Sequence, residues 1–238
     1  MAKSLLKILA IFIVGMVGGI FAEEIFWPYF VERPLFYKYR LEKAPIFVTE
    51  KKEIRIQENT ALKDAISKVE KTIVFIKSKT KTGKILEGSG FILTSDGLII
   101  TLAELVPEGS KVSLFVEGEI FSPQVLKRDL NKNLALLKVE KKNLSTAGFF
   151  NFEKLKLGER VFLIGIFFEN GNIKNFVDEG IVKSFDENKI ETNIQGSKEI
   201  LGTPLFDIEG RILGINYLSK EGKLISIPIT HIRSFASI

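Results

Sequence analysis

The sequence predicts a mainly β protein preceded by one membrane-spanning helix. An apolar run ends near Ala22, and from Thr72 onward short apolar stretches alternate with turn-forming Gly, Asn and Asp residues. Many short strands with few helices are typical of a β-barrel or a β-sandwich, and the pattern does not choose between them. The chain has 238 residues and no Cys, so it forms no disulfide and allows one domain of fewer than about 200 residues.

The amino-terminal segment Leu5 to Ala22 is apolar apart from Lys7. A helix of about 18 residues spans roughly 27 Å, close to the thickness of the hydrocarbon core. Lys3 and Lys7 stand at its start, which predicts a cytoplasmic amino terminus and an extracytoplasmic remainder. A cleavable signal peptide ending at Ala22 is the alternative; Ile20, two residues earlier, is not small, so we favour an uncleaved single-pass anchor.

Three regions are expected: an anchor over residues 1–24, a juxtamembrane linker and strand over 25–58, and one domain over 59–238. The linker carries prolines, and Ile46 to Gln57 alternates well enough to form a strand. A short helix is predicted from Asn59 or Thr60 to Lys71, because its apolar residues recur at helical spacing.

The rest of the chain predicts strands and one last helix, about Thr230 to Ala236, after Pro228. The predicted strands are Ile73–Lys77, Gly90–Leu93, Leu98–Thr101, Lys111–Val116, Ile120–Lys127, Leu134–Val139, Arg160–Gly165, Val177–Phe185, Lys189–Ile194, Pro204–Asp207, Ile212–Tyr217 and Lys223–Ile227.

Charge and motif content argue against several kinds of ligand. The net charge is +5, but lysines are interleaved with glutamates, which is typical of a solvated surface. The densest basic stretch lies between Lys77 and Lys84; without an aromatic stacking pattern we favour a solvated loop over a site for anionic lipid or nucleic acid. No metal-ligand spacing and no phosphate-binding Gly-rich loop occurs, so we expect no nucleic-acid partner, no metal and no cofactor.

Five segments, in order, carry a family resemblance. The stretches from Gly88 to Thr101 (GSGFILTSDGLIIT) and from Asn131 to Val139 (NKNLALLKV) resemble the elements around the catalytic histidine and aspartate of HtrA/Deg-type, trypsin-like serine proteases. Leu157–Val161, Glu179–Val182 and Phe206–Asn216 also fit. The resemblance covers roughly residues 59 to 238. It implies a chymotrypsin-like fold of two packed six-stranded β-barrels with a cleft between them, and we expect no PDZ domain after it.

The three positions that align with the family's catalytic triad hold other residues. Glu104 occupies the histidine position, Asn133 the aspartate position and Leu201 the serine position. A triad works as a unit of nucleophile, base and orienting carboxylate, and a leucine side chain has no lone pair to attack a carbonyl. The chain is therefore predicted to be a pseudoprotease, which means that it is not an enzyme.

The turn that forms the family's oxyanion hole is altered as well. Glu199 aligns with a glycine, Gly202 is retained, and Thr203 replaces a second glycine. A glutamate is expected to reshape the turn, and its negative charge opposes a developing oxyanion.

Other residues were considered as catalytic groups. Ser197 beside Lys198 suggests a Ser–Lys pair, but an ordinary polar turn is favoured. His231 is the single histidine and is expected at the surface near the carboxyl terminus. Phe167 and Phe168 are expected in a loop, either as core residues or, if exposed, as an apolar contact patch.

The predicted function is binding of peptide segments or of a related protease. The cleft can add an extended peptide as a strand without a triad, and the expected walls are Ile215, Tyr217 and Ile225. Two alternatives stay open: an active serine-type endopeptidase that uses an unrecognised nucleophile, and a purely structural membrane tether.

Overall fold

The computed structural model describes residues 2–31, 58–169 and 172–238, and side chains from 3–27, 60–169 and 172–238. The chain divides into two units, Met1–Arg55 and Ile56–Ile238, each described here by itself. The predicted strand from Ile46 to Gln57 lies outside the described residues.

The amino-terminal unit is helical over its described residues. Helix α1 (Ala2–Ile20) continues into a π-helical segment, η1 (Phe21–Val31), so the predicted linker over residues 25–58 begins within a helical segment. Lys3–Trp27 is long and apolar enough to cross a membrane, a property that an amino-terminal signal sequence shares. The helix therefore meets the length and composition of the predicted anchor.

The second unit begins with helix α2 (Glu58–Val69), which ends in a 3₁₀ turn, η3 (Glu70–Thr72). Ala65 and Val69, four residues apart, are buried against the first barrel's core. Lys68 donates from Nζ to the carbonyl oxygen of Glu209, 2.9 Å away. The predicted helix over residues 59–71 is thus present and packed on both halves of the domain.

The first half of the domain is a seven-stranded antiparallel sheet in the order β5-β4-β1-β2-β3-β7-β6, curled into a half-barrel rather than a closed six-stranded barrel. The single strand predicted over Ile120–Lys127 is two strands, because Pro123 has no N–H to donate to a ladder. The strands are β1 (Ile73–Lys79), β2 (Ile85–Ile92), β3 (Leu98–Thr101), β4 (Lys111–Val116), β5 (Glu119–Phe121), β6 (Gln124–Asp129) and β7 (Leu134–Lys138).

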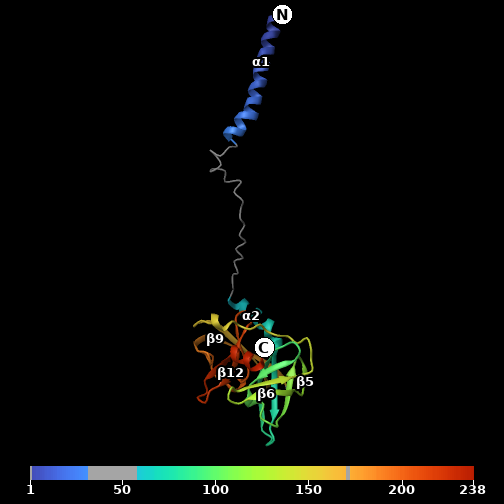
Figure 1. The fold of residues 1–238 in the computed structure, drawn as a ribbon, viewed down its shortest axis with the longest axis vertical. Helices are drawn as coiled ribbons and strands as arrows, with labels where there is room; N and C mark the ends of the chain where they lie inside the picture. Colours follow the sequence, from blue (N-terminus) through green and yellow to red (C-terminus); the bar gives the residue numbers. More distant parts are fainter. Residues whose placement is uncertain (1, 32–57, 170–171) are drawn as a thin grey trace. The chain divides into compact units, whose positions relative to one another are not determined.

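The second half is a closed six-stranded barrel in the order β10-β13-β12-β11-β8-β9, and a carboxy-terminal helix, α3 (Ile229–Ala236), follows it. Figure 1 shows β9 and β12 on one side of the domain and β5 and β6 on the other. The predicted fold class, a trypsin-like all-β domain with short helices, is confirmed. The strands are β8 (Arg160–Glu169), β9 (Asn172–Phe185), β10 (Ile190–Thr192), β11 (Pro204–Asp207), β12 (Ile212–Leu218) and β13 (Leu224–Pro228).

Strands β8 and β9 extend beyond the barrel as a long hairpin, paired from Arg160↔Ile181 to Glu169↔Asn172. Its outer part, residues 166–169 and 172–176, is called the β8–β9 arm here. Phe167 and Phe168 lie in β8, so their predicted placement in a loop is wrong. The arm is held by aromatic contacts: the ring centroids of Phe168 and Phe75 are 6.5 Å apart, and those of Phe167 and Phe176 are 5.9 Å apart.

An exposed turn of the first barrel gives a pH-dependent prediction. The Asp96 carboxylate accepts hydrogen bonds from Lys138 Nζ (2.8 Å) and from Thr94 Oγ1. The bond from Lys138, followed by that from Thr94, lowers the pKa of Asp96 from 3.8 to about 2. The folded state therefore binds this proton less tightly than the unfolded chain, so the stabilisation is complete above about pH 4 and is lost as the pH falls through 2.

We expect Asp96→Asn to lower the thermal midpoint of the full chain in detergent micelles at pH 7, by a difference that shrinks between pH 4 and pH 2. The measurement is circular dichroism during heating. Asp64→Asn, at an exposed position of α2, is the control. A deficit for Asp96→Asn that is equal at pH 7 and pH 2 contradicts the assignment.

Candidate functional site

A cleft of about 600 Å³ lies between the two halves of the domain. Strands β1 and β2 line it from the first half, and β8, β12 and the turn before β11 line it from the second. Its walls combine apolar and charged side chains, among them Gly88, Glu104, Phe168, Glu199, Leu201 and Leu218. Because the lining comes from segments far apart in sequence, the cleft exists only when both halves are packed.

Glu104 and Asn133 form a reciprocal pair at the cleft. Asn133 Nδ2 donates to Glu104 Oε1 (2.8 Å), and the Glu104 N–H donates back to Asn133 Oδ1 (3.1 Å). Asn133 has a φ of 52°, a left-handed conformation that asparagine tolerates better than most residues. The Asn133 carbonyl oxygen also accepts a hydrogen bond from the Ala103 N–H (3.1 Å). Asn133 therefore holds the short helix that carries Glu104 through both its backbone and its side chain. The pair combines a carboxylate with a neutral amide.

Leu201 lines the same cleft as Glu104 and is partly buried against the core. Its carbonyl oxygen accepts from the Ser89 N–H (2.8 Å), and its own N–H donates to the Lys198 carbonyl (3.3 Å). The fold therefore brings residues 104, 133 and 201 to one place, since Asn133 is bonded to Glu104. The side chain at 201 is a hydrocarbon and supplies no nucleophilic atom.

The turn around Leu201 is a 3₁₀ helix, η6 (Lys198–Ile200). The N–H groups of Ile200, Leu201 and Thr203 donate to carbonyls of the same turn, at 3.4, 3.3 and 3.0 Å. These donors are therefore engaged rather than aimed at a ligand. Glu199 lines the cleft; the hydrogen bond from the Ser197 side chain, followed by one from its own backbone N–H, lowers the pKa of its carboxyl. Glu199 thus contributes a carboxylate to a lining that also holds Lys84 and Lys198.

Behind the turn lies a buried polar network that the sequence did not reveal. Asn216 Nδ2 donates to Thr203 Oγ1 (3.0 Å), Ser226 Oγ donates to Asn216 Oδ1, and Thr203 Oγ1 donates to the Ile200 carbonyl (2.7 Å). The Gly202 N–H donates to the Asn216 carbonyl (2.8 Å). All these side chains are fully buried, so each bond removes a desolvation cost, and Thr203 acts as a positioning residue.

The three residues predicted as cleft walls are not among those that line this cleft. Ile215 is fully buried in the core, because β12 runs between β11 and β13 there, so its side chain does not reach a ligand. Tyr217 and Ile225 are paired across β12 and β13 and half-buried, and burial raises the pKa of Tyr217. Leu218, the next residue of β12, lines the cleft instead. The prediction thus named Tyr217 where Leu218 lines the cleft, and adjacent residues of a strand point to opposite faces of the sheet.

The other candidates for a catalytic group do not meet in this cleft. The Ser197 side chain is hydrogen-bonded to Glu199, and Lys198 lines the cleft at its rim. His231 lies in α3 and lines a different pocket, with Thr230 and Ser234.

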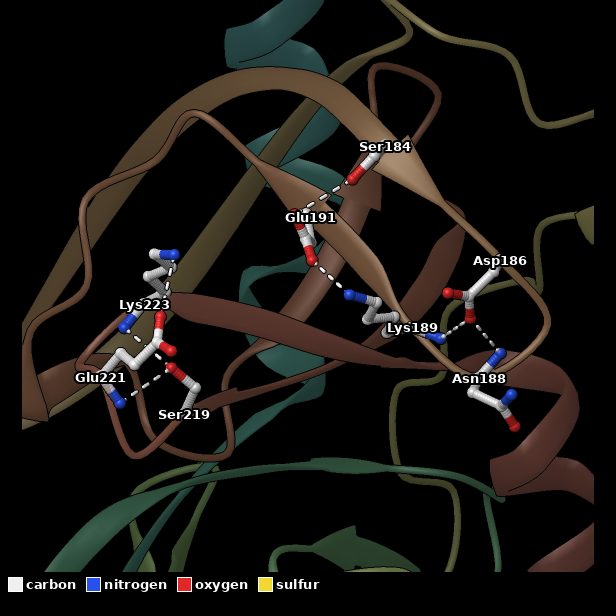
Figure 2. Close-up of polar contacts among 8 residues, drawn as sticks. All are labelled: Ser184, Asp186, Asn188, Lys189, Glu191, Ser219, Glu221 and Lys223. Carbon is white, nitrogen blue, oxygen red and sulfur yellow. Dashed lines mark hydrogen bonds and ion pairs between the residues drawn. The ribbon is translucent and has the colours of Figure 1, made fainter.

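The outer face of the second barrel carries exposed ion pairs (Figure 2). Lys189 Nζ donates to Glu191 (2.6 Å), and Ser184 Oγ donates to the same carboxylate (3.1 Å). The hydrogen bond from Lys189, followed by that from Ser184, lowers the pKa of Glu191. The same bond to Glu191 raises the pKa of Lys189. Glu221 and Lys223 form a second pair, 2.9 Å apart. Each of these two lysines is paired with a carboxylate, and exposed ion pairs of this kind contribute little to stability.

Comparison with known proteins gives one family. The profile described as trypsin-like peptidase domain matches residues 88–215. A probable periplasmic DegP-like serine endoprotease of Pseudomonas putida is 32% identical over 138 residues, 54% of this chain and 28% of that protein. Serine protease HTRA1 of Xenopus laevis is 31% identical over 163 residues, 62% of this chain and 35% of that protein. The chain thus matches about a third of its curated relatives' length.

Solved structures show the same fold. The serine endoprotease from Yersinia pestis is similar with a TM-score of 0.66 at 22% identity, over 74% of this chain and 65% of that one. The Pseudomonas putida and Yersinia pestis proteins are named as serine endoproteases, and HTRA1 is named as a serine protease. The prediction that the chain is not an enzyme is therefore wrong: it rested on the aligned triad positions and the oxyanion turn, whereas the similar proteins are named as proteases.

The turn gives a prediction with a matched control. Gly202 has a φ of 77°, and a Cβ at this position would lie 2.0 Å from the Ser89 carbonyl oxygen. Gly222 has a φ of 76° with no atom within 4 Å of a Cβ. Gly202→Ala should therefore lower the free energy of unfolding by about 1–3 kcal/mol more than Gly222→Ala, since only the first adds a clash to the shared backbone strain. Urea unfolding followed by circular dichroism measures both; equal losses would show that the turn is free to move away from Ser89.

Proposed function

Because the chain belongs to the trypsin-like peptidase domain family, in its HtrA/Deg branch, we propose that its cleft binds an extended segment of a peptide or unfolded protein as an added β-strand. The ligand would be held mainly through main-chain hydrogen bonds, with side chains received by the apolar walls of the cleft.

The backbone of β12 carries this proposal. The N–H and C=O of Asn216 point toward the turn, where they bond Thr203 and Gly202 at 2.8 Å each. Leu218, two residues on, presents its main-chain groups to the same side, because alternate residues of a strand face the same neighbour. The ladder with β11 extends along β12 only to Ile215. Within the described residues, Leu218 therefore has an unpaired main-chain edge, and its side chain lines the cleft.

The amino-terminal helix supports a membrane location for this binding. Lys3 and Lys7 stand at one end of an otherwise apolar helix, which favours a cytoplasmic amino terminus and an extracytoplasmic domain. The relative from Pseudomonas putida is named as periplasmic, in agreement with that side. The ligands proposed are thus peptide segments, or a related protease, outside the cytoplasm.

The proposed strand addition predicts an alternating effect of N-methylation. The full chain in lipid nanodiscs is used to select binders from a pool of fluorescein-labelled dodecapeptides of random sequence. Each selected peptide is then remade with N-methyl groups on its odd or on its even residues. N-methyl groups on the residues whose N–H groups face β12 should weaken binding by about 2- to 12-fold per lost hydrogen bond. N-methyl groups on the alternate residues should have little effect.

The measurement is fluorescence anisotropy. Equal affinities of the odd-methylated and the even-methylated peptide would refute strand addition. Failure to select any peptide would refute the proposed function as a whole.

Peptide hydrolysis is a second candidate, favoured by the endoprotease names of the relatives. Residue 201 is a leucine, so cleavage by this chain requires a nucleophile elsewhere. A fluorophosphonate probe tests this candidate. Covalent labelling of one serine, together with peptide cleavage that is abolished when that serine is changed to alanine, is the expected result for a serine-type activity. Cleavage that survives the substitution would point to a contaminating protease.

A further inference from the structure

A second pocket, of about 190 Å³, adjoins the cleft beneath the β8–β9 arm. We call it the arm pocket. Strands β1, β4 and β5 form its floor, and the arm covers one side. Its lining is almost wholly apolar, with one lysine at the rim; the residues that matter here are Phe75, Lys77, Phe115, Ile120, Phe168 and Ile173.

The arm pocket is continuous with the cleft. Phe75 and Phe168 line both, and the two pockets meet at these stacked rings, whose centroids are 6.5 Å apart. Phe75 is buried, whereas Phe168 is 45% exposed. A ligand that lies in the cleft can therefore place one side chain past Phe168 into the arm pocket, where the charged side chain of Lys77 lies over the Phe168 ring.

Within the described part of the second unit, residues 58–169 and 172–238, the pocket presents exposed apolar surface. Ile120 is 77% exposed, in β5, a strand at the edge of its sheet. Lys77 stands at the rim, with its Nζ 5.4 Å from the centre of the Phe168 ring and 2.8 Å from Glu87. An apolar centre with a charged rim is the arrangement that anchors one side chain of a partner.

The size of the pocket limits its occupant. Sites for drug-sized ligands or cofactors run to about 300–1,000 Å³, so a pocket of 190 Å³ is small for one and suits one large side chain. We propose that the arm pocket takes a single large apolar side chain, of the phenylalanine or leucine kind, from the same peptide segment that lies in the cleft. The proposal rests on the proposed function of the cleft and adds a sequence preference to it.

An extended peptide alternates its side chains between two faces, with a rise of about 3.3 Å per residue. A residue held in the arm pocket therefore lies at a fixed offset from the residues that pair with β12. Peptides selected by the cleft should share one position enriched in large apolar residues, while the other positions vary.

Ile120→Asp tests the arm pocket without disturbing the cleft, since Ile120 does not line the cleft and is largely exposed. Leu157→Asp, at a residue 67% exposed outside both pockets, is the matched control. In nanodiscs, Ile120→Asp should weaken binding of a selected peptide by about tenfold or more, because a full anchor contact is lost. It should leave unchanged the affinity of the same peptide with alanine at the enriched position. Leu157→Asp should bind both peptides as the wild-type chain does.

The possible outcomes distinguish the proposed role of the arm pocket from the proposed binding of peptides by the cleft. Peptides that bind the cleft with no shared apolar position, or with equal affinity for wild-type and Ile120→Asp, overturn the arm pocket and leave the cleft intact. No selectable peptide at all removes the proposed function. A concentration-dependent dimer in native mass spectrometry that Ile120→Asp abolishes would assign the pocket to a second copy of the chain and overturn the inference.

Discussion

The contact between Ser89 and the turn at Leu201 joins the two halves of the domain. Ser89 is fully buried, and each of its polar groups bonds a different element: its N–H the Leu201 carbonyl, its Oγ the Ile166 N–H, and its carbonyl oxygen the Thr101 hydroxyl. Gly202 is required beside it, because no Cβ fits there. The cleft wall, the base of the arm and the first barrel therefore share one anchoring residue.

Sequence reasoning predicted the elements that local patterns determine. Most strand positions could be predicted because turn residues and apolar alternation lie within a few positions of each other. The two-barrel fold and the alignment of residues 104, 133 and 201 came from the resemblance to HtrA/Deg-type proteases. What sequence reasoning missed depends on distant contacts. The arm extends β8 because Phe168 stacks on Phe75, 93 residues earlier in the numbering (168 − 75). The network of Thr203, Asn216 and Ser226 is likewise invisible in a sequence, where each residue looks like an ordinary polar strand position.

The proposed binding by the cleft does not require reactive side chains at residues 104, 133 and 201. Leu201 is held by a backbone contact, from the Ser89 N–H to its carbonyl oxygen, which does not depend on its side chain. Glu104 is held both by the backbone bond from Ala103 to Asn133 and by the Asn133 side chain. The main-chain edge at Leu218 is independent of these side chains. Recognition of an extended backbone and chemistry on it are therefore separate properties of this fold, and each needs its own test.

The proposed arm pocket adds a preference for one kind of side chain to a cleft whose main-chain pairing accepts most peptide sequences. Main-chain pairing accepts almost any sequence, so discrimination between ligands has to come from side-chain pockets. The cleft lining holds both acidic and basic side chains, whereas the apolar surface around Phe168 favours large hydrocarbon side chains. Segments that expose such side chains in extended form are those of unfolded proteins, because folded proteins bury them. A cleft that pairs with backbone and an arm that receives an apolar side chain together favour an unfolded chain over a folded surface.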